Sequence, residues 1–538
     1  MVFARRSTTL LAAIIASCAM VLSLTACTSD NKTVVDGQTT VTSNSAGGVA
    51  VFTPSDGITL NQQTPLNKWA KLVPDLAKAL ADAGFKKGDI DHTTSDSLAK
   101  QSRAIQDFVV DHLSNNTTDD SGIAIAPDNM TLLVAPVVEA DASTRQYGDY
   151  VSQNLSTNDV TDEGATSDGE SSKDDSSNTE SDSTASDEQA QAVDRLVSSL
   201  KLAKESGMHV VLLGNSIEGY KPDAFVKFSD AQTIGKLQAE KMVSKLKLDK
   251  ASKDNPKYIE VLLPYTAVDE KGNANDSTFA QEAFRGIWQV LGSYYQKGVV
   301  ESPSGTLDGK STENDWQAVA YDAAKEGSTA KVLDKRLAKT DGQSTLTRID
   351  GIITMNDYIA SEVVKELDDL GYTGSAADIN PQITISGIVG NITGKKDLSR
   401  DAVPDPIKSP ENDNANDSSS SDDDADEDTS ASDKDRDSQW PLVTGYGAYV
   451  SNIPSIVNGK QWMTGMEDRQ TIATDIAQAC AKLNKDEALN SMPSIRNSEV
   501  GGVKKIPTIS EPLLAVSASN LKSALIDPGY ISLADAGL

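Results

Sequence analysis

The sequence predicts a doubly wound α/β protein with two sheets. Two observations lead to this class. Short apolar, β-branched runs alternate with amphipathic segments along most of the 538 residues, as in parallel sheets covered by helices. Roughly a dozen such runs occur, which is too many for one ordinary sheet and suits two.

The clearest strand-to-helix unit is residues 349–370, IDGIITMNDYIASEVVKELDDL. Its β-branched run is typical of a strand buried on both faces. Asn356 and Asp357 follow at the cap position of a helix whose apolar periodicity ends at Gly371. Because the carboxyl ends of strands face the ligand site in open α/β sheets, these two residues are either a cap alone or also binding residues. We expect Asn356 to bind and Asp357 to serve mainly as a cap.

The remaining elements are predicted from the same two periodicities. Short apolar runs predict strands, and these lie at 48–54, 90–93, 130–137, 209–213, 225–228, 258–263, 299–300, 382–386, 442–444, 453–457 and 513–516, with a further short element at 462–465. Apolar residues at helical spacing predict helices, and these lie at 65–83, 97–113, 192–206, 231–246, 279–296, 316–326 and 470–483.

The chain is acidic, with a formal net charge of −30 and a pI of about 4.5. Nucleic acid is not expected as a partner, because phosphate binding needs clustered Lys and Arg. Much of the negative charge lies in residues 149–188 and 397–437, which are rich in Asp, Ser, Glu, Asn and Thr. Segments of this composition bury too little apolar surface to fold, so we predict two disordered surface insertions. They are either solubilising insertions or loops that bind cations or repel the anionic envelope.

The amino terminus is predicted to be a lipoprotein signal peptide, residues 1–26. Arg5 and Arg6 precede an apolar run that ends in Leu-Thr-Ala-Cys at Cys27. This ending resembles a lipobox, in which the cysteine sulfur is lipidated, and palmitate and related chains would then hold the protein on the extracytoplasmic face of the cell membrane. An ordinary signal peptide is the alternative. Residues 27–48, rich in Ser, Thr, Asn and Gly, would form a flexible tether.

The motifs of catalysis are missing from the sequence. The three histidines, His92, His112 and His209, have no zinc-binding spacing, and no nucleophile elbow, phosphate-binding loop or dinucleotide fingerprint occurs. Cys480 lies in an amphipathic helix and is expected to be a core residue. We therefore expect no enzyme, no cofactor and no metal. A binding protein instead needs amide, charged and aromatic side chains around one site.

Several segments resemble, in the same order, the type I periplasmic binding proteins of sugar ABC transporters, and most closely the xylose-binding branch. They are 228–243 (FSDAQTIGKLQAEKMV), 273–286 (NANDSTFAQEAFRG), the unit 349–370, 444–462 (TGYGAYVSNIPSIVNGKQW) and 502–538. The resemblance implies two Rossmann-like, doubly wound lobes joined by three hinge crossings. Lobe 1 would be 49–228 with 466–500, and lobe 2 would be 229–465 with 501–538.

The resemblance also implies a set of ligand-binding residues and partners. These residues are Lys68, Trp69, Asn215, Asp230, Asn275, Trp316, Asn356 and Tyr446. The implied partners are a monosaccharide and an ABC permease, with the protein acting as a monomer. The chain departs from the family pattern at Gly214-Asn215, Ser229, Tyr446-Gly447 and Glu467, where charged or hydrogen-bonding anchors of the family are replaced. These departures leave open another sugar, a non-sugar ligand or no ligand.

Two hypotheses follow. The first is a solute-binding protein that captures a small polar ligand, a sugar, and delivers it to an ABC permease. The second is a lipoprotein that keeps the binding fold but acts as a sensor or an envelope interaction protein without transport. The replaced anchors and the acidic insertions favour the second, and the order of the family-like segments favours the first.

Overall fold

The computed structural model describes residues 46–55, 65–115, 129–138, 144, 146–156, 180–268, 275–323, 325–338, 346–376 and 439–538. The signal peptide, Cys27, most of the tether and the acidic stretch 397–437 lie outside these residues. The described chain contains a mainly parallel seven-stranded sheet and a parallel four-stranded sheet, each with helices on both faces, so the predicted α/β class is confirmed. No helix in the described part is both long enough and apolar enough to cross a bilayer.

The larger sheet has seven strands, and every neighbouring pair is parallel except β15 and β16. Its order is β15 (Ile495–Val500), β16 (Val503–Ser510), β7 (Ala224–Lys227), β5 (His209–Leu213), β3 (Met130–Val134), β1 (Gly48–Pro54) and β2 (Ile90–Ser95). The strands in its centre are buried on both faces, as their continuous apolar runs predict.

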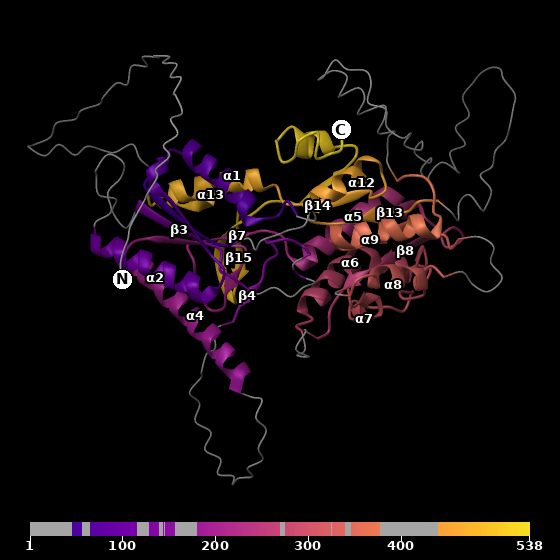
Figure 1. Cartoon of the computed structure of the whole chain (residues 1–538), viewed down its shortest axis with the longest axis horizontal. Coiled ribbons are helices and arrows are strands. Elements are labelled where there is room, and N and C mark those ends of the chain that lie inside the picture. Colours follow the sequence, from indigo (N-terminus) through magenta and orange to yellow (C-terminus); the bar gives the residue numbers. More distant parts are fainter. Residues whose placement is uncertain are drawn as a thin grey trace, which may run out of the picture. The chain divides into compact units, whose positions relative to one another are not determined.

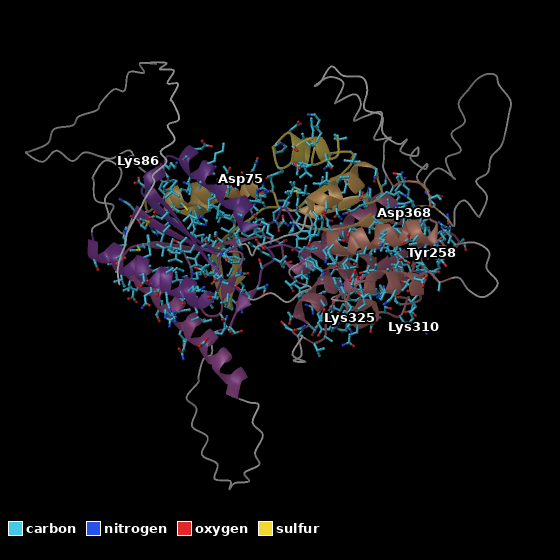
Figure 2. All side chains as sticks on the ribbon, viewed as in Figure 1. Asp75, Lys86, Tyr258, Lys310, Lys325 and Asp368 are labelled. Carbon is cyan, nitrogen blue, oxygen red and sulfur yellow. The ribbon has the colours of Figure 1, made fainter. Side chains whose placement is uncertain are left out.

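Two pairs of helices cover this sheet. Helices α1 (Trp69–Asp82) and α13 (Arg469–Leu483) pack on one face, and α2 (Leu98–Asn115) and α4 (Glu180–Glu205) pack on the other (Figure 1). Alternate side chains of β1 enter the two cores, with Val51 on the α1 side and Phe52 on the α2 side. An ion pair joins α1 to α13, because Arg469 Nε lies 2.6 Å from the carboxylate of Asp75, which Figure 2 labels.

The smaller sheet has four parallel strands: β10 (Val300–Glu301), β8 (Lys257–Val261), β12 (Gly351–Ile353) and β13 (Leu442–Thr444). Helices α5 (Ala231–Leu246) and α6 (Thr278–Gln296) pack on one face, and α8 (Ser328–Arg336) and α9 (Asp357–Leu370) on the other. Gly235 and Gly286 let α5 and α6 approach closely, since a Cβ at either would lie 2.2 Å or 2.0 Å from a backbone oxygen of the other helix.

Short elements complete the described chain. Strand pairs form between β9 (Leu263–Pro264) and β11 (Ala320–Tyr321), β4 (Asn154–Leu155) and β6 (Ser216–Ile217), and β14 (Met463–Met466) and β17 (Leu514–Ser517). Helices α7 (Trp316–Val319) and α12 (Ile453–Val457) are short. Single turns lie at Lys87–Asp89, Leu248–Lys250, Val450–Asn452, Leu489–Ser491 and Lys522–Ile526.

Four predictions need correction. The lobe boundary at residue 500 is wrong, because β16 (Val503–Ser510) pairs with β7 in the larger sheet. Residues 453–457 form a helix, which Pro454 starts with its fixed φ. The helix predicted at 316–326 ends at Val319, where β11 begins. The first acidic insertion is shorter than the predicted range 149–188, because Tyr150 and Val151 are buried and α4 begins at Glu180.

Candidate functional site

The predicted binding residues lie mainly where parallel strands end. Asn215 follows β5 and Asp230 follows β7 in the larger sheet, while Asn356 follows β12 and Tyr446 follows β13 in the smaller sheet. Because parallel strands share one direction, the carboxyl ends of each sheet form one edge, where ligands of this fold class bind. We therefore take this carboxyl edge as the candidate site.

One segment of the chain, residues 146–153, contacts many of these positions. At the start of α1, Lys68 Nζ lies 3.0 Å from Asp149 Oδ1, and the backbone N–H of Trp69 donates to Asp149 Oδ2 at 3.1 Å. Tyr150 donates its hydroxyl to the carbonyl of Lys68 at 2.5 Å. The carboxylate of Asp149 thus binds a cation and a free backbone N–H at a helix amino terminus, which also favours negative charge.

The same segment completes an aromatic cluster around Trp69. The Trp69 ring is 3% exposed and makes edge contacts with Tyr150, at 5.2 Å between centroids, and with Phe228, at 5.7 Å. Tyr150 stacks on Phe228 at 4.8 Å. Trp69, predicted to offer an apolar face to a ligand, is therefore packed by side chains of its own protein.

Asn215 holds the far end of the segment. Its Nδ2 donates to the carbonyl of Pro136 at 2.9 Å, and its Oδ1 accepts from the backbone N–H of Gln153 at 3.0 Å. The backbone N–H of Ser152 donates to the carbonyl of Ser229 at 3.0 Å, and β4 pairs with β6 immediately beyond. The hydrogen bonds of residues 149–155 therefore attach them to the larger sheet, while the side chain of Val151 is buried in the core of the smaller sheet.

Gln146 and Tyr147, at the start of the segment, contact residues of the smaller sheet instead. Asn356 Nδ2 donates to Gln146 Oε1 at 3.2 Å, and Tyr449 donates its hydroxyl to the carbonyl of Gln146 at 2.7 Å. The ring of Tyr147 lies 4.8 Å from that of Phe279 and 6.3 Å from that of Tyr446. The segment consequently brings Lys68, Trp69, Asn215, Asn356 and Tyr446 into one set of contacts.

Asn356 and Asp357 have different roles from each other. Asn356 caps α9, since its Oδ1 accepts from the backbone N–H of Ile359 at 2.9 Å. Asp357, expected mainly as a cap, is instead a fully buried acceptor. Its oxygens accept from Gln461 Nε2 at 2.7 Å, Thr464 Oγ1 at 2.9 Å and the backbone N–H of Tyr449 at 2.9 Å. Burial raises the pKa of Asp357 to about 6, although these three bonds favour the carboxylate.

A second buried acid, Glu467, lies where the chain returns from β14 to α13. Tyr446 donates its hydroxyl to Glu467 Oε1 at 2.5 Å, and Ser229 donates both its hydroxyl and its backbone N–H to the same carboxylate. Burial raises the pKa of Glu467, and burial with the neighbouring carboxylate raises the pKa of Tyr446. In the sequence, Glu467 was notable only as a departure from the family pattern. In the structure it is hydrogen-bonded to two other such departures, Ser229 and Tyr446.

Three predicted residues make other contacts. Asp230 caps α5, accepting from the backbone N–H of Thr233 at 2.7 Å, and its carboxylate lies 2.7 Å from Lys227 Nζ. Asn275 Nδ2 donates to the carbonyl of Thr266 at 2.8 Å. Trp316 makes an edge contact with Tyr265 at 5.1 Å, and the hydroxyl of Tyr265 donates to the carbonyl of Asn275. Asn275 and Trp316 therefore meet around Tyr265.

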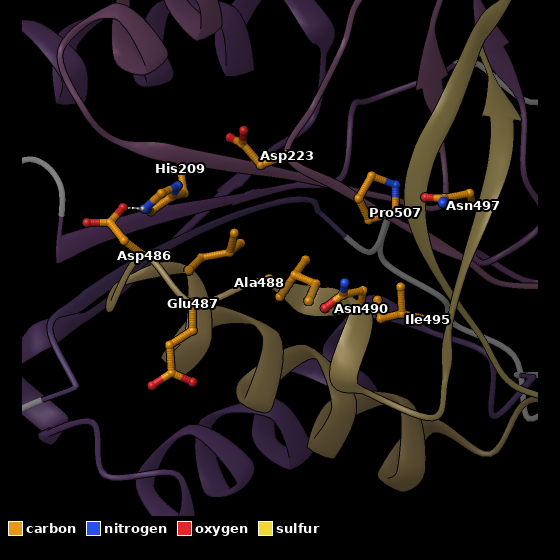
Figure 3. A pocket seen from close by; sticks show the side chains of 11 residues that line it. His209, Asp223, Asp486, Glu487, Ala488, Asn490, Ile495, Asn497 and Pro507 are labelled. Carbon is orange, nitrogen blue, oxygen red and sulfur yellow. Dashed lines mark ion pairs between the residues drawn. The ribbon is translucent and has the colours of Figure 1, made fainter.

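A cavity of about 530 Å³ lies elsewhere, at the amino ends of the strands (Figure 3). It is lined by His209, Asp223, Leu483, Asp486, Glu487, Ala488, Leu489, Asn490, Ile495, Asn497 and Pro507. His209 is the first residue of β5, so this cavity is at the edge opposite to the candidate site. Within the described ranges, no group of three His, Cys, Asp or Glu side chains could hold a metal ion. The carboxyl edge, which holds the predicted residues, remains the candidate site.

Comparison with known proteins gives structural matches alone. No family model matches the chain, and no match is found among curated proteins. The chain is similar to an ABC transporter solute-binding protein from Clostridium phytofermentans with bound β-D-glucose (17% identity, 91% of this chain and 99% of that chain, TM-score 0.44). It is also similar to a carbohydrate transporter solute-binding protein from Chloroflexus aurantiacus in complex with D-glucose (18% identity, 91% and 98%, TM-score 0.43).

Proposed function

We propose that this chain is a lipid-anchored, extracytoplasmic solute-binding protein that captures a sugar for import by an ABC transporter, with a relationship to the xylose-binding branch. One observation carries the proposal. Five of the binding residues selected from the sequence share one contact network, although they come from loops and helix starts beside both sheets. They are Lys68, Trp69, Asn215, Asn356 and Tyr446. Amide and charged groups pair with sugar hydroxyls, and aromatic rings pack on the apolar face of a sugar ring.

Closure between the two sheets is the physical basis of capture in this proposal. The polar groups that would hold a sugar come from loops on both sheets, so a bound sugar would interact with both and favour the state in which they are close. The protein would act as a monomer, which sedimentation of the mature chain tests.

A thermal-shift screen tests the proposal directly. Ligand that binds only the folded state raises the unfolding midpoint by mass action. The probes are D-xylose, D-glucose, L-arabinose, D-ribose and D-allose. We expect at least one to stabilise the wild type and to lose affinity for Asn356→Ser, which keeps a cap oxygen for Ile359 but loses the amide donor. Asn490→Ala, at the opposite edge, is the matched control and should bind like the wild type. No stabilisation by any sugar would contradict the proposal.

The lipid anchor is a separate part of the proposal, supported by the Leu-Thr-Ala-Cys sequence at Cys27. Metabolic labelling with radioactive palmitate should mark the wild type and leave Cys27→Ser unlabelled and released from the membrane fraction. Cys480→Ser is the control, because Cys480 is buried in α13 and should not affect labelling. Equal labelling of the wild type and Cys27→Ser would contradict the anchor.

The second candidate function is a sensor or envelope interaction protein that does not transport. The specific observation in its favour is that Asn356, Lys68 and the N–H of Trp69 already bind the protein's own segment 146–153. Sugar binding in the screen favours transport. A flat screen, together with capture of a membrane partner that is not a permease, favours the second function.

A further inference from the structure

The segment 146–153 occupies the position of a ligand within the proposed site. Gln146 supplies an amide oxygen to Asn356, and Asp149 supplies a carboxylate to Lys68 and to the N–H of Trp69. The ring of Tyr147 packs against Phe279 and Tyr446. These are the hydrogen-bond acceptors and the flat apolar face that the same residues would meet in a bound sugar.

The two ends of the segment are attached to different sheets. Residues 149–155 are attached to the larger sheet by the Asp149 carboxylate, the stacked ring of Tyr150, the Asn215 amide and the β4–β6 pair. Gln146 and Tyr147 reach the smaller sheet through two hydrogen bonds and ring contacts. Tyr147 is 1% exposed and packs with Val151 in the apolar core of the smaller sheet, so its displacement exposes a buried ring, whereas the polar contacts of Asp149 and Gln153 are made with the larger sheet.

Because this segment is attached to the same chain beside the site, it competes strongly with a free ligand for Asn356 and Tyr446. A group attached to the same chain competes at a high effective concentration, so even modest contacts keep it bound. A ligand that needs the unoccupied form then binds with an affinity reduced by the fraction of molecules in that form. The contacts that Gln146 and Tyr147 make would thus set a threshold that only a well-matched ligand exceeds.

We propose that Gln146 and Tyr147 are an intramolecular occupant of the site and that a solute binds only by displacing them from Asn356, Tyr446 and Tyr449. This inference rests on the proposed function, and it assigns to that function a built-in element of ligand selection. Removing the occupant should strengthen binding of every sugar that the site accepts, in contrast to Asn356→Ser, which should weaken it.

The test uses the full mature chain and has two readouts. The first is calorimetric titration of the five sugars named above into the wild type, Tyr147→Ala and Gln146→Ala. We expect the dissociation constant to fall about tenfold in Tyr147→Ala and by less in Gln146→Ala. Gln153→Ala is the matched control from the same segment, because Gln153 contacts Asn215 through its backbone N–H and the substitution preserves that bond. An unchanged or larger dissociation constant in both variants overturns the inference.

The second readout is hydrogen exchange, which needs no ligand for its first step. In the free wild type, the peptide that contains Tyr147 should be protected, since the N–H of Tyr147 donates to the carbonyl of Thr144 at 3.0 Å. Saturation with the sugar mixture should increase exchange there and leave β3 unchanged. Full exchange in the free protein, or sugar binding without a change in this peptide, overturns the inference but leaves the proposed function standing. Absence of binding to the wild type and to Tyr147→Ala contradicts the proposed function itself.

Discussion

The two edges of the larger sheet differ in how their polar groups are used. At the carboxyl edge, Asn215 and Lys68 bind a segment of the same chain, and both side chains are largely buried. At the amino edge, a cavity of about 530 Å³ is lined by groups such as Glu487 and Asn490 that are exposed to solvent.

This contrast distinguishes a candidate binding site, at the carboxyl edge, from a surface depression, at the amino edge. Polar groups that hold fixed partners in a buried environment are costly to lose, whereas exposed groups contribute little. The cavity at the amino edge and its polar lining could be taken for a functional site if cavity size alone were considered. The carboxyl edge has the organised hydrogen bonds. Three of the four predictions below compare a residue from it, or from the neighbouring smaller sheet, with one from the amino edge, and the other compares Asp357 with its own amide variant.

The largest difference is expected for the carboxylates. Asp357→Ala removes the acceptor of three buried donors, on Gln461, Thr464 and Tyr449. Leaving these donors unpaired should lower the free energy of unfolding by about 3–5 kcal/mol. Glu487→Ala, whose ion pair with Lys482 is 53% exposed on the Glu487 side, should change it by less than about 0.5 kcal/mol. Urea unfolding measures both, and equal effects would contradict the contrast.

The pH dependence of stability should follow Asp357. Its pKa rises from 3.8 to about 6 on folding, so the folded state favours the protonated form. Stability from this group is fully present below pH 3.8 and is lost as the pH rises through 6. The stability of the wild type relative to Asp357→Asn should therefore fall by about 3 kcal/mol between those values. Glu467 titrates in the same direction in both proteins, so the difference isolates Asp357. A constant difference across this range would contradict the raised pKa.

A smaller difference is expected for the amides. Asn215→Ala removes the acceptor of the partly buried Gln153 N–H and the donor to the buried carbonyl of Pro136. We expect a loss of about 1–3 kcal/mol in the free energy of unfolding and faster hydrogen exchange in residues 150–156. Asn490→Ala, at the exposed amino edge, should change stability by less than about 0.5 kcal/mol. Unchanged exchange in Asn215→Ala would show that the segment is held by other contacts.

The smallest difference is expected for the lysines. The Lys68–Asp149 pair has side chains that are 15% and 20% exposed, and Lys68→Met should cost about 1 kcal/mol. The Lys482–Glu487 pair is more exposed, at 29% and 53%, and Lys482→Met should cost less than about 0.5 kcal/mol. The Lys68 effect should shrink in a background of Asp149→Asn, and a double-mutant cycle measures this coupling. An additive cycle would contradict the ion pair.

Local patterns in the sequence were sufficient for most strands, most long helices and the Asn356 cap, because apolar periodicity and cap residues act over a few positions. They did not predict β15, β16 or α8. The role of Asp357 could not be predicted in the same way, since Tyr449, Gln461 and Thr464 are about a hundred residues away in the chain. Composition also concealed the segment 146–153. Its surroundings are acidic and polar, and the only local signal was a pair of aromatic residues, Tyr147 and Tyr150, within a polar stretch.

The central claim is that the carboxyl edge binds a sugar and that the chain's own Gln146 and Tyr147 compete for it. Calorimetric titration of the sugar panel into the wild type, Asn356→Ser and Tyr147→Ala tests both parts at once. The account predicts a shared ligand, with weaker binding to Asn356→Ser and about tenfold tighter binding to Tyr147→Ala than to the wild type. Equal affinity in all three proteins would contradict it.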